Sequence, residues 1–206
     1  MTAEPTVFVV DDDEAMRTSL QWLIESTGLP VKTYASASAF LADYYPGRAG
    51  CLLLDVRMPG MSGLELQTLL AREGFGIPVI LITGHGDIAM AVRAMKAGAL
   101  DFIEKPFHDE DLLRSIRQAL DHDQRLRNER LARAETIRRL AELTPREHEV
   151  MVMVTEGKSN KDIAALLGVS TKTVEVHRAR VMEKMQAESL ADLVRMVLLA
   201  DPRSLG

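Results

Sequence analysis

Over its first 120 or so residues the sequence alternates between short apolar, β-branched runs and segments with helical spacing of apolar side chains. Such alternation is typical of a parallel sheet with helices on both faces, so it constrains the fold strongly. We expect an α/β fold over residues 5–122 in this chain of 206 residues. The expected strands are residues 6–10, 31–34, 51–54, 77–83 and 100–103.

The second part of the chain, residues 143–206, has the helix-start and helix-end signals of a small all-α domain. Thr144, Pro145 and Glu147 form a capping box with proline at the first helical position. Short helices are expected from there to about Gly157, over 160–167, over 170–185 and over 189–200. Between the two domains, residues 123–142 are dense in Arg, Asp and Glu, and neither Gly nor Pro interrupts them. We expect a long, solvated helical linker there, with a weak coiled-coil seam as the alternative.

Composition narrows the class of protein. A hydrophobic content of 47% is sufficient for true cores. The single cysteine, Cys51, excludes an internal disulfide, and the sequence has no cysteine cluster for zinc. The sequence has neither a run of membrane-spanning length nor a signal peptide, so we expect a cytoplasmic protein with no membrane partner. Residues 1–120 hold 10 Lys and Arg against 16 Asp and Glu, whereas residues 121–206 hold 15 against 14, which indicates two different roles.

Several polar and charged residues that could take part in chemistry lie where the predicted strands end. Asp11 and Asp12 end the first strand, Asp55 the third and Thr83 the fourth, and Lys105 follows the fifth. Because the carboxyl ends of parallel strands meet at one edge, these side chains should converge. Crowded carboxylates need a cation, and oxygen ligands with room for water suit Mg²⁺. A hydroxyl and an ammonium facing such a cation form a site for a phosphoryl group.

Taken singly, each of these residues has an ordinary structural explanation. Asp12 or Asp13 would cap the first helix, Thr83 would be a strand residue, and Lys105 would be solvated. Their joint placement at the ends of neighbouring strands favours the functional interpretation.

This pattern resembles the receiver domain of bacterial two-component response regulators. The matching residues are Asp11-Asp12, Asp55 with Met58-Pro59-Gly60, Thr83-Gly84 and Lys105-Pro106-Phe107. The resemblance implies a flavodoxin-like sheet of order 2-1-3-4-5 that is phosphorylated on Asp55 by a sensor histidine kinase. It implies Mg²⁺ held by Asp12, Asp55 and the backbone carbonyl of Arg57, with Asp11 helping through water. It also implies that Thr83 and Lys105 bind the phosphoryl oxygens, that Phe102 is the switch aromatic, and that the Lys105–Pro106 peptide bond is cis. Residues 83–87 are similar to the FixJ branch in particular.

The second domain resembles the LuxR/FixJ-type helix-turn-helix. The resemblance is carried by Thr144–Glu147, Asn160–Ala164 and Ser170–Arg178, with residues 160–167 as the scaffold helix and 170–185 as the recognition helix. Some relatives have lysine at positions 175 and 179, where this chain has Glu175 and Ala179, so base preference does not carry over. The DNA-contacting residues are expected to be Lys172, Thr173, Glu175, Val176, Arg178, Ala179, Arg180 and Lys184.

The sequence therefore predicts a phosphorylation-activated transcription regulator that dimerises and binds double-stranded promoter DNA, with RNA polymerase as a further partner. Its chemistry would be limited to self-catalysed phosphotransfer and autodephosphorylation. Two alternatives stand beside this hypothesis. A phosphohydrolase with an aspartyl nucleophile usually has a second acid two residues later, where this chain has Arg57. A phosphorylation-independent interaction protein would not need the complete pocket.

Overall fold

The computed structural model describes residues 4–84 and 88–200. The chain divides into two compact units, Met1–Leu126 and Arg127–Gly206, which are described separately. Among the described residues, none of the helices combines the length and apolarity that a membrane span requires.

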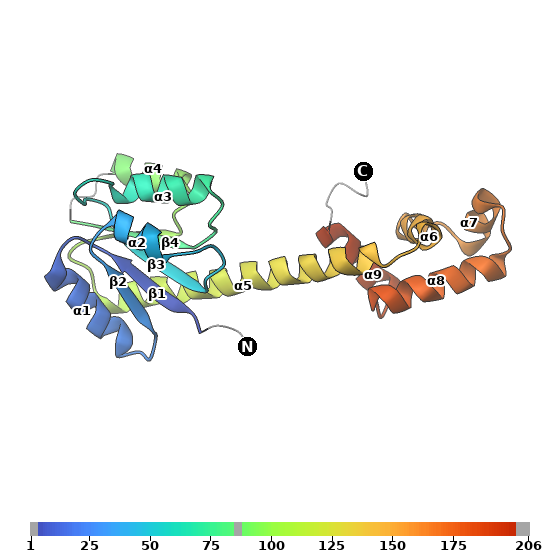
Figure 1. Ribbon diagram of the computed structural model, residues 1–206, viewed down its shortest axis with the longest axis horizontal. Helices are drawn as coiled ribbons and strands as arrows, with labels where there is room; N and C mark the ends of the chain where they lie inside the picture. The colour runs from blue at the N-terminus through green and yellow to red at the C-terminus, as the bar shows by residue number, and fades with distance from the viewer. Residues whose placement is uncertain (1–3, 85–87, 201–206) are drawn as a thin grey trace. The chain divides into compact units, whose positions relative to one another are not determined.

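The first unit is built on a five-stranded parallel sheet (Figure 1). Its strands lie in the order β2-β1-β3-β4-β5, which confirms the expected topology. The strand predicted at 77–83 begins at Val79, because Pro78 has no N–H to donate and contributes only its carbonyl, which accepts from the N–H of Leu52 at 2.9 Å. The strands are β1 Thr6–Val10, β2 Val31–Tyr34, β3 Gly50–Asp55, β4 Val79–Thr83 and β5 Asp101–Glu104.

Helices cover both faces of this sheet (Figure 1). They begin where the sequence supplies caps: the side chain of Asp13 caps α1, Ser36 caps α2, and Ser62 forms a capping box with Glu65 at α3. The helices are α1 Glu14–Glu25, α2 Ala37–Asp43, α3 Gly63–Arg72, α4 Ile88–Lys96 and α5 Asp109–Ala141.

Alternate residues of each strand face opposite helical layers, so the sheet has two cores. One face packs under α2, α3 and α4, and the other under α1 and the first part of α5. Cys51 is a free, fully buried thiol in the second core, and burial raises its pKa, as expected for an inert side chain. The strand residues of the first core are Phe8, Val10, Leu52, Leu54, Val79 and Leu81, and those of the second are Val7, Val9, Cys51, Leu53, Ile80 and Ile82.

The second unit is a small helical domain with a core of its own. Thr144 and Glu147 form the predicted capping box, with Pro145 in the first turn. Gly168 ends α7 in the left-handed conformation, and this gives the short turn into α8. The helices are α6 Pro145–Thr155, α7 Asn160–Leu167, α8 Thr171–Met185 and α9 Leu190–Ala200.

The residues predicted as a linker, 123–142, are helical up to Ala141, because α5 continues without a break. The boundary between the compact units falls inside this helix, after Leu126. Asp123 is buried and accepts a hydrogen bond of 3.0 Å from the N–H of Gly50 at the start of β3. The start of the expected linker is therefore packed against the sheet, and the domain limits drawn from the sequence stay a prediction.

Candidate functional site

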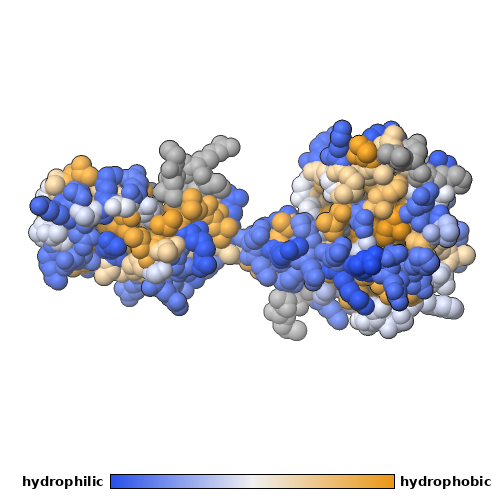
Figure 2. Space-filling model, turned by 180° about the vertical axis from the view of Figure 1, so that it is seen from behind, coloured by the Kyte–Doolittle hydropathy of each residue, from blue (hydrophilic) through white to orange (hydrophobic). Residues whose placement is uncertain are grey.

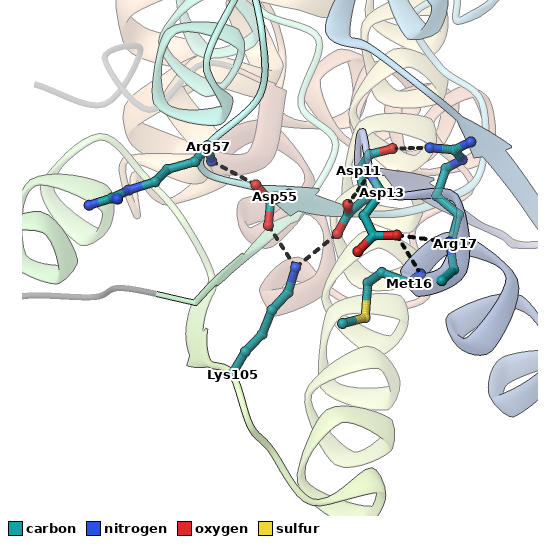
Figure 3. Close-up of polar contacts among 8 residues, drawn as sticks. Asp11, Asp13, Met16, Arg17, Asp55, Arg57 and Lys105 are labelled. Carbon is teal, nitrogen blue, oxygen red and sulfur yellow. Dashed lines mark hydrogen bonds and ion pairs between the residues drawn. The ribbon is translucent and has the colours of Figure 1, made fainter.

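A lysine bridges two buried carboxylates at the carboxyl edge of the sheet (Figure 3). The Nζ atom of Lys105 donates to Asp11 Oδ2 at 2.9 Å and to Asp55 Oδ1 at 2.8 Å. Asp11 follows β1, Asp55 ends β3 and Lys105 follows β5, so the sheet order brings them together from distant parts of the sequence. Three of the residues predicted from the strand ends thus converge.

The carboxylate of Asp55 is held at both oxygens. While Oδ1 accepts from Lys105, Oδ2 accepts from the backbone N–H of Arg57 at 2.7 Å. The side chain is 9% exposed. Burial raises the pKa of Asp55, against the opposing hydrogen bond and charge of Lys105. The result is an oriented carboxylate whose ionised form depends on the neighbouring ammonium.

Lys105 is positioned by the backbone of β4. Its N–H donates to the carbonyl of Thr83 at 2.7 Å, and the Lys105–Pro106 peptide bond is cis, as the resemblance implied. Burial acts to lower the pKa of Lys105, but hydrogen bonds to Asp55 and Asp11 outweigh burial and raise it above its usual value. The ammonium is therefore a permanent cation beside the two acids.

The loop between β1 and α1 is held by its own polar groups (Figure 3). Asp11 Oδ1 accepts from the N–H of Asp13 at 2.9 Å, and Asp13 caps α1 through the N–H groups of Ala15 and Met16. The guanidinium of Arg17 donates to the Asp11 carbonyl at 2.7 Å. Sequence reasoning missed Arg17, although a basic residue one turn into the helix after an acidic run was a usable signal.

Asp12 is placed differently from its neighbours. Asp11 is buried, whereas Asp12 is exposed. Within residues 4–84 and 88–200, no three His, Cys, Asp or Glu side chains gather as metal ligands. The structure therefore brings Asp11 and Asp55 together but leaves Asp12 outside their hydrogen-bonded cluster.

Thr83 and Phe102 occupy adjoining strands. Thr83 is 1% exposed at the end of β4. Phe102 on β5 pairs in register with Leu81 and is half-buried against the core under α3 and α4. The residues His85 to Asp87 of the FixJ-like segment lie outside the described residues.

In the helical unit, α8 has one buried and one exposed face. Val174, Val181 and Met185 lie in the core. The exposed positions carry most of the predicted DNA-contacting residues, while Thr173, Arg178 and Lys184 are half-buried. The exposed ones are Lys172, Glu175, Val176, Ala179 and Arg180.

Four of these charged side chains already have partners within the unit. Lys172 pairs with Glu175 at 3.3 Å, and Arg178 on α8 donates to Asn160 Oδ1 on α7 at 3.1 Å. Lys184 donates to the buried carboxylate of Glu147 at 2.6 Å and to the carbonyl of Glu142 at 3.1 Å. Its ammonium therefore ties α6 to α8, a structural role that was not expected from the sequence.

Comparison with known families agrees with both units. The family described as "Response regulator receiver domain" matches residues 7–117, and the family "Bacterial regulatory proteins, luxR family" matches residues 141–197. A receiver joined to a DNA-binding domain implies two kinds of partner, a kinase and DNA.

Similar proteins cover nearly the whole chain. The transcriptional regulatory protein FixJ of Azorhizobium caulinodans is 50% identical, over 94% of this chain and 92% of its own. Nodulation protein W of Bradyrhizobium diazoefficiens is 50% identical, over 92% of this chain and 84% of its own. The solved structure of the response regulator StyR, 47% identical, has a TM-score of 0.84 over 95% of this chain and 98% of its own. The chain is thus a phosphorylation-dependent transcription regulator and belongs to the FixJ/NarL family of response regulators, with a receiver and a LuxR-type DNA-binding domain.

Proposed function

We propose that Asp55 is the residue that takes the phosphoryl group from the sensor kinase. The observation that carries this proposal is the bridge from Lys105 to Asp55 and Asp11, since it orients a buried carboxylate next to a fixed cation. A carboxylate oxygen of Asp55 attacks phosphorus, and the bond from phosphorus to the donor's imidazole nitrogen breaks. The electron pair of that bond stays on the nitrogen, and the imidazole, which carries a proton on its other nitrogen, leaves as the neutral ring. Phosphoryl transfer needs little from a protein beyond such positioning and neutralisation of charge.

Mg²⁺ is the cation that the pocket should hold. Receiver domains in general require it for phosphorylation, and the donor set here is all oxygen, which is what Mg²⁺ prefers. Asp55, Asp12 and the carbonyl of Arg57 would bind it, with Asp11 acting through water. Two of these carboxylates already share one cation, Lys105, which supports the fit. When bound, the ion neutralises charge on the phosphoryl oxygens.

Thr83 and Lys105 would hold the transferred group. Lys105 would exchange one of its carboxylate partners for a phosphoryl oxygen, and the Thr83 hydroxyl would donate to another. Phosphorylation replaces the single negative charge of the Asp55 carboxylate with about two negative charges on the phosphoryl group, which would draw the Thr83 side chain towards it. Phe102 would then turn into the space that the Thr83 side chain leaves, so the surface of α4 and β5 would change and pair two receivers.

The exposed face of α8 would lie in the major groove of promoter DNA. Arg180 and Lys172 would contact phosphates, and Glu175, Val176 and Ala179 would face base edges. Thr173 and Arg178 are half-buried at the side of this face. Each would contact a phosphate through the exposed part of its side chain. Lys184, committed to Glu147, would act by holding α8 in place. At promoters the bound dimer would act on RNA polymerase.

The last helix offers a surface for pairing two DNA-binding domains. Of its apolar residues, Leu193 and Val197 are used in the core of the unit, whereas Leu190 and Leu198 are exposed. Figure 2 shows apolar surface on the helical unit bordered by hydrophilic residues. Leu198 and Leu199 also line a cavity of about 630 Å³ between α5 and α9. Pairing through this helix would double the phosphate contacts on a two-fold site.

Labelling with acetyl phosphate and Mg²⁺ tests the proposal directly. Intact-mass spectrometry should find one acid-labile phosphoryl group, absent in Asp55→Asn and in the presence of EDTA. Asp43→Asn is the matched control, because Asp43 is an ion-paired aspartate of the same unit whose partners are Lys32 and Arg48. Labelling that persists in Asp55→Asn would overturn the assignment.

A further inference from the structure

Arg17 binds a backbone group rather than a carboxylate in the acidic pocket. Its NH1 donates at 2.7 Å to the carbonyl oxygen of Asp11 (Figure 3). That carbonyl belongs to the peptide unit between Asp11 and Asp12. Because a peptide unit is planar, the same plane contains the N and Cα atoms of Asp12. Arg17 therefore holds the plane from which the Asp12 side chain departs.

The other polar groups of Asp11 already have partners. Its N–H donates to the carbonyl of Tyr34 at 3.2 Å, Oδ1 accepts from Asp13, and Oδ2 accepts from Lys105. Arg17 completes this set at the carbonyl. Asp12, by contrast, is exposed, and the fixed peptide plane on its N-terminal side limits where its carboxylate can point.

The guanidinium is well suited to this position. Residues 11–14 are four consecutive acids, Asp11, Asp12, Asp13 and Glu14, which repel one another. Arginine keeps its charge at every relevant pH, and a charged donor strengthens the hydrogen bond to the carbonyl. Its planar fork also fixes direction better than the rotating ammonium of lysine.

We propose that Arg17 is a positioning residue for cation binding. It holds the Asp11–Asp12 peptide plane so that the exposed carboxylate of Asp12 turns towards those of Asp11 and Asp55 when the ion binds. This inference rests on the proposed Mg²⁺ site and adds a residue that does not touch the ion.

The test is a Mg²⁺ titration of the unphosphorylated full chain, followed by the amide NMR shifts of Asp55 and Lys105. Arg17→Gln should weaken Mg²⁺ binding by about tenfold, as losses of outer-shell partners do. Arg117→Gln is the matched control, because it removes the same charge from an exposed position on α5 and should leave the binding constant unchanged. Arg17→Lys should recover part of the loss, and it serves as the test variant if Arg17→Gln fails to fold.

A double-mutant cycle separates positioning from a general structural effect. If Arg17 acts through Asp12, Arg17→Gln should cause little further loss in a chain that already carries Asp12→Asn. Full additivity of the two losses would overturn the inference. So would wild-type Mg²⁺ affinity in Arg17→Gln while Asp12→Asn binds weakly. If Asp12→Asn itself binds Mg²⁺ like the wild type, the proposed metal site fails and the inference fails with it.

Discussion

Lys184 on α8 donates a hydrogen bond of 2.6 Å from its ammonium to the carboxylate of Glu147 on α6. The Glu147 side chain is 3% exposed, and it also accepts from the N–H of Thr144 at 2.9 Å. One carboxylate therefore completes the cap of α6 and joins that helix to the recognition helix. Lys184 was predicted from the sequence to contact DNA, but its ammonium is already paired with a carboxylate within the domain.

The contact predicts a pH dependence of stability. The hydrogen bond from Lys184, with that from Thr144, lowers the pKa of Glu147 from 4.5 to about 2. Because the pKa of Glu147 is lower in the folded state, its ionised form stabilises the fold. This stabilisation is fully present at a pH above the unfolded pKa of 4.5, and it is lost as the pH falls to about 2. The free energy of opening of α6 and α8, from amide hydrogen exchange, should differ between wild type and Glu147→Gln by up to about 3 kcal/mol near pH 7. The difference should shrink towards pH 2, and a constant difference would contradict the assignment.

Substitution of Lys184 should lower the stability of the domain, whereas substitution of Arg180 should change DNA binding. Lys184→Met leaves the buried Glu147 carboxylate without its cation, at a cost of about 1–3 kcal/mol in unfolding free energy. Arg180→Met removes an exposed charge, so stability should be unchanged while the salt slope of DNA affinity falls by about 1. Chemical denaturation and DNA binding at several salt concentrations distinguish them. The reverse pattern would exchange their roles.

Asp123 should hold the first part of α5 against the sheet. Asp123→Ala would leave the buried N–H of Gly50 without its acceptor, costing about 1–3 kcal/mol in the stability of the first unit. Asp123→Asn keeps an acceptor oxygen and is the matched control, expected to lose much less. Urea denaturation followed by the fluorescence of Trp22, the single tryptophan of the chain, measures both. Equal losses of stability in Asp123→Ala and Asp123→Asn would show that the charge of Asp123, not its hydrogen bond to Gly50, stabilises the unit.

Thr83 should couple phosphorylation to dimerisation. Thr83→Ala retains Asp55 and Lys105, so acetyl phosphate should still label the chain. Without the hydroxyl, the phosphoryl group has no donor at the end of β4, and the dimerisation constant of the labelled protein should fall by about fivefold, the effect of losing about 1 kcal/mol. Light scattering on labelled and unlabelled protein checks this. Equal dimer content in Thr83→Ala and wild type would remove Thr83 from the switch.

The sequence by itself determined the elements and the chemistry of the pocket. Period-two and helical patterning, caps such as Thr144 with Glu147, and acids after apolar runs are local signals, and local signals are readable without a fold. Asp11, Asp55, Thr83 and Lys105 were found because each stands where a strand ends. The resemblance to receivers and LuxR-type domains supplied the strand order and the site roles.

Only the tertiary structure decided which partners these residues take. Arg17 with the Asp11 carbonyl, Asp123 with the Gly50 N–H, and Lys184 with Glu147 join groups whose pairing no local pattern encodes. The same lysine on a helix surface is a DNA contact or a core ion pair, depending on whether a neighbouring helix places a buried carboxylate within reach. That choice follows from the packing of whole elements, because a buried charge must find its partner inside the fold.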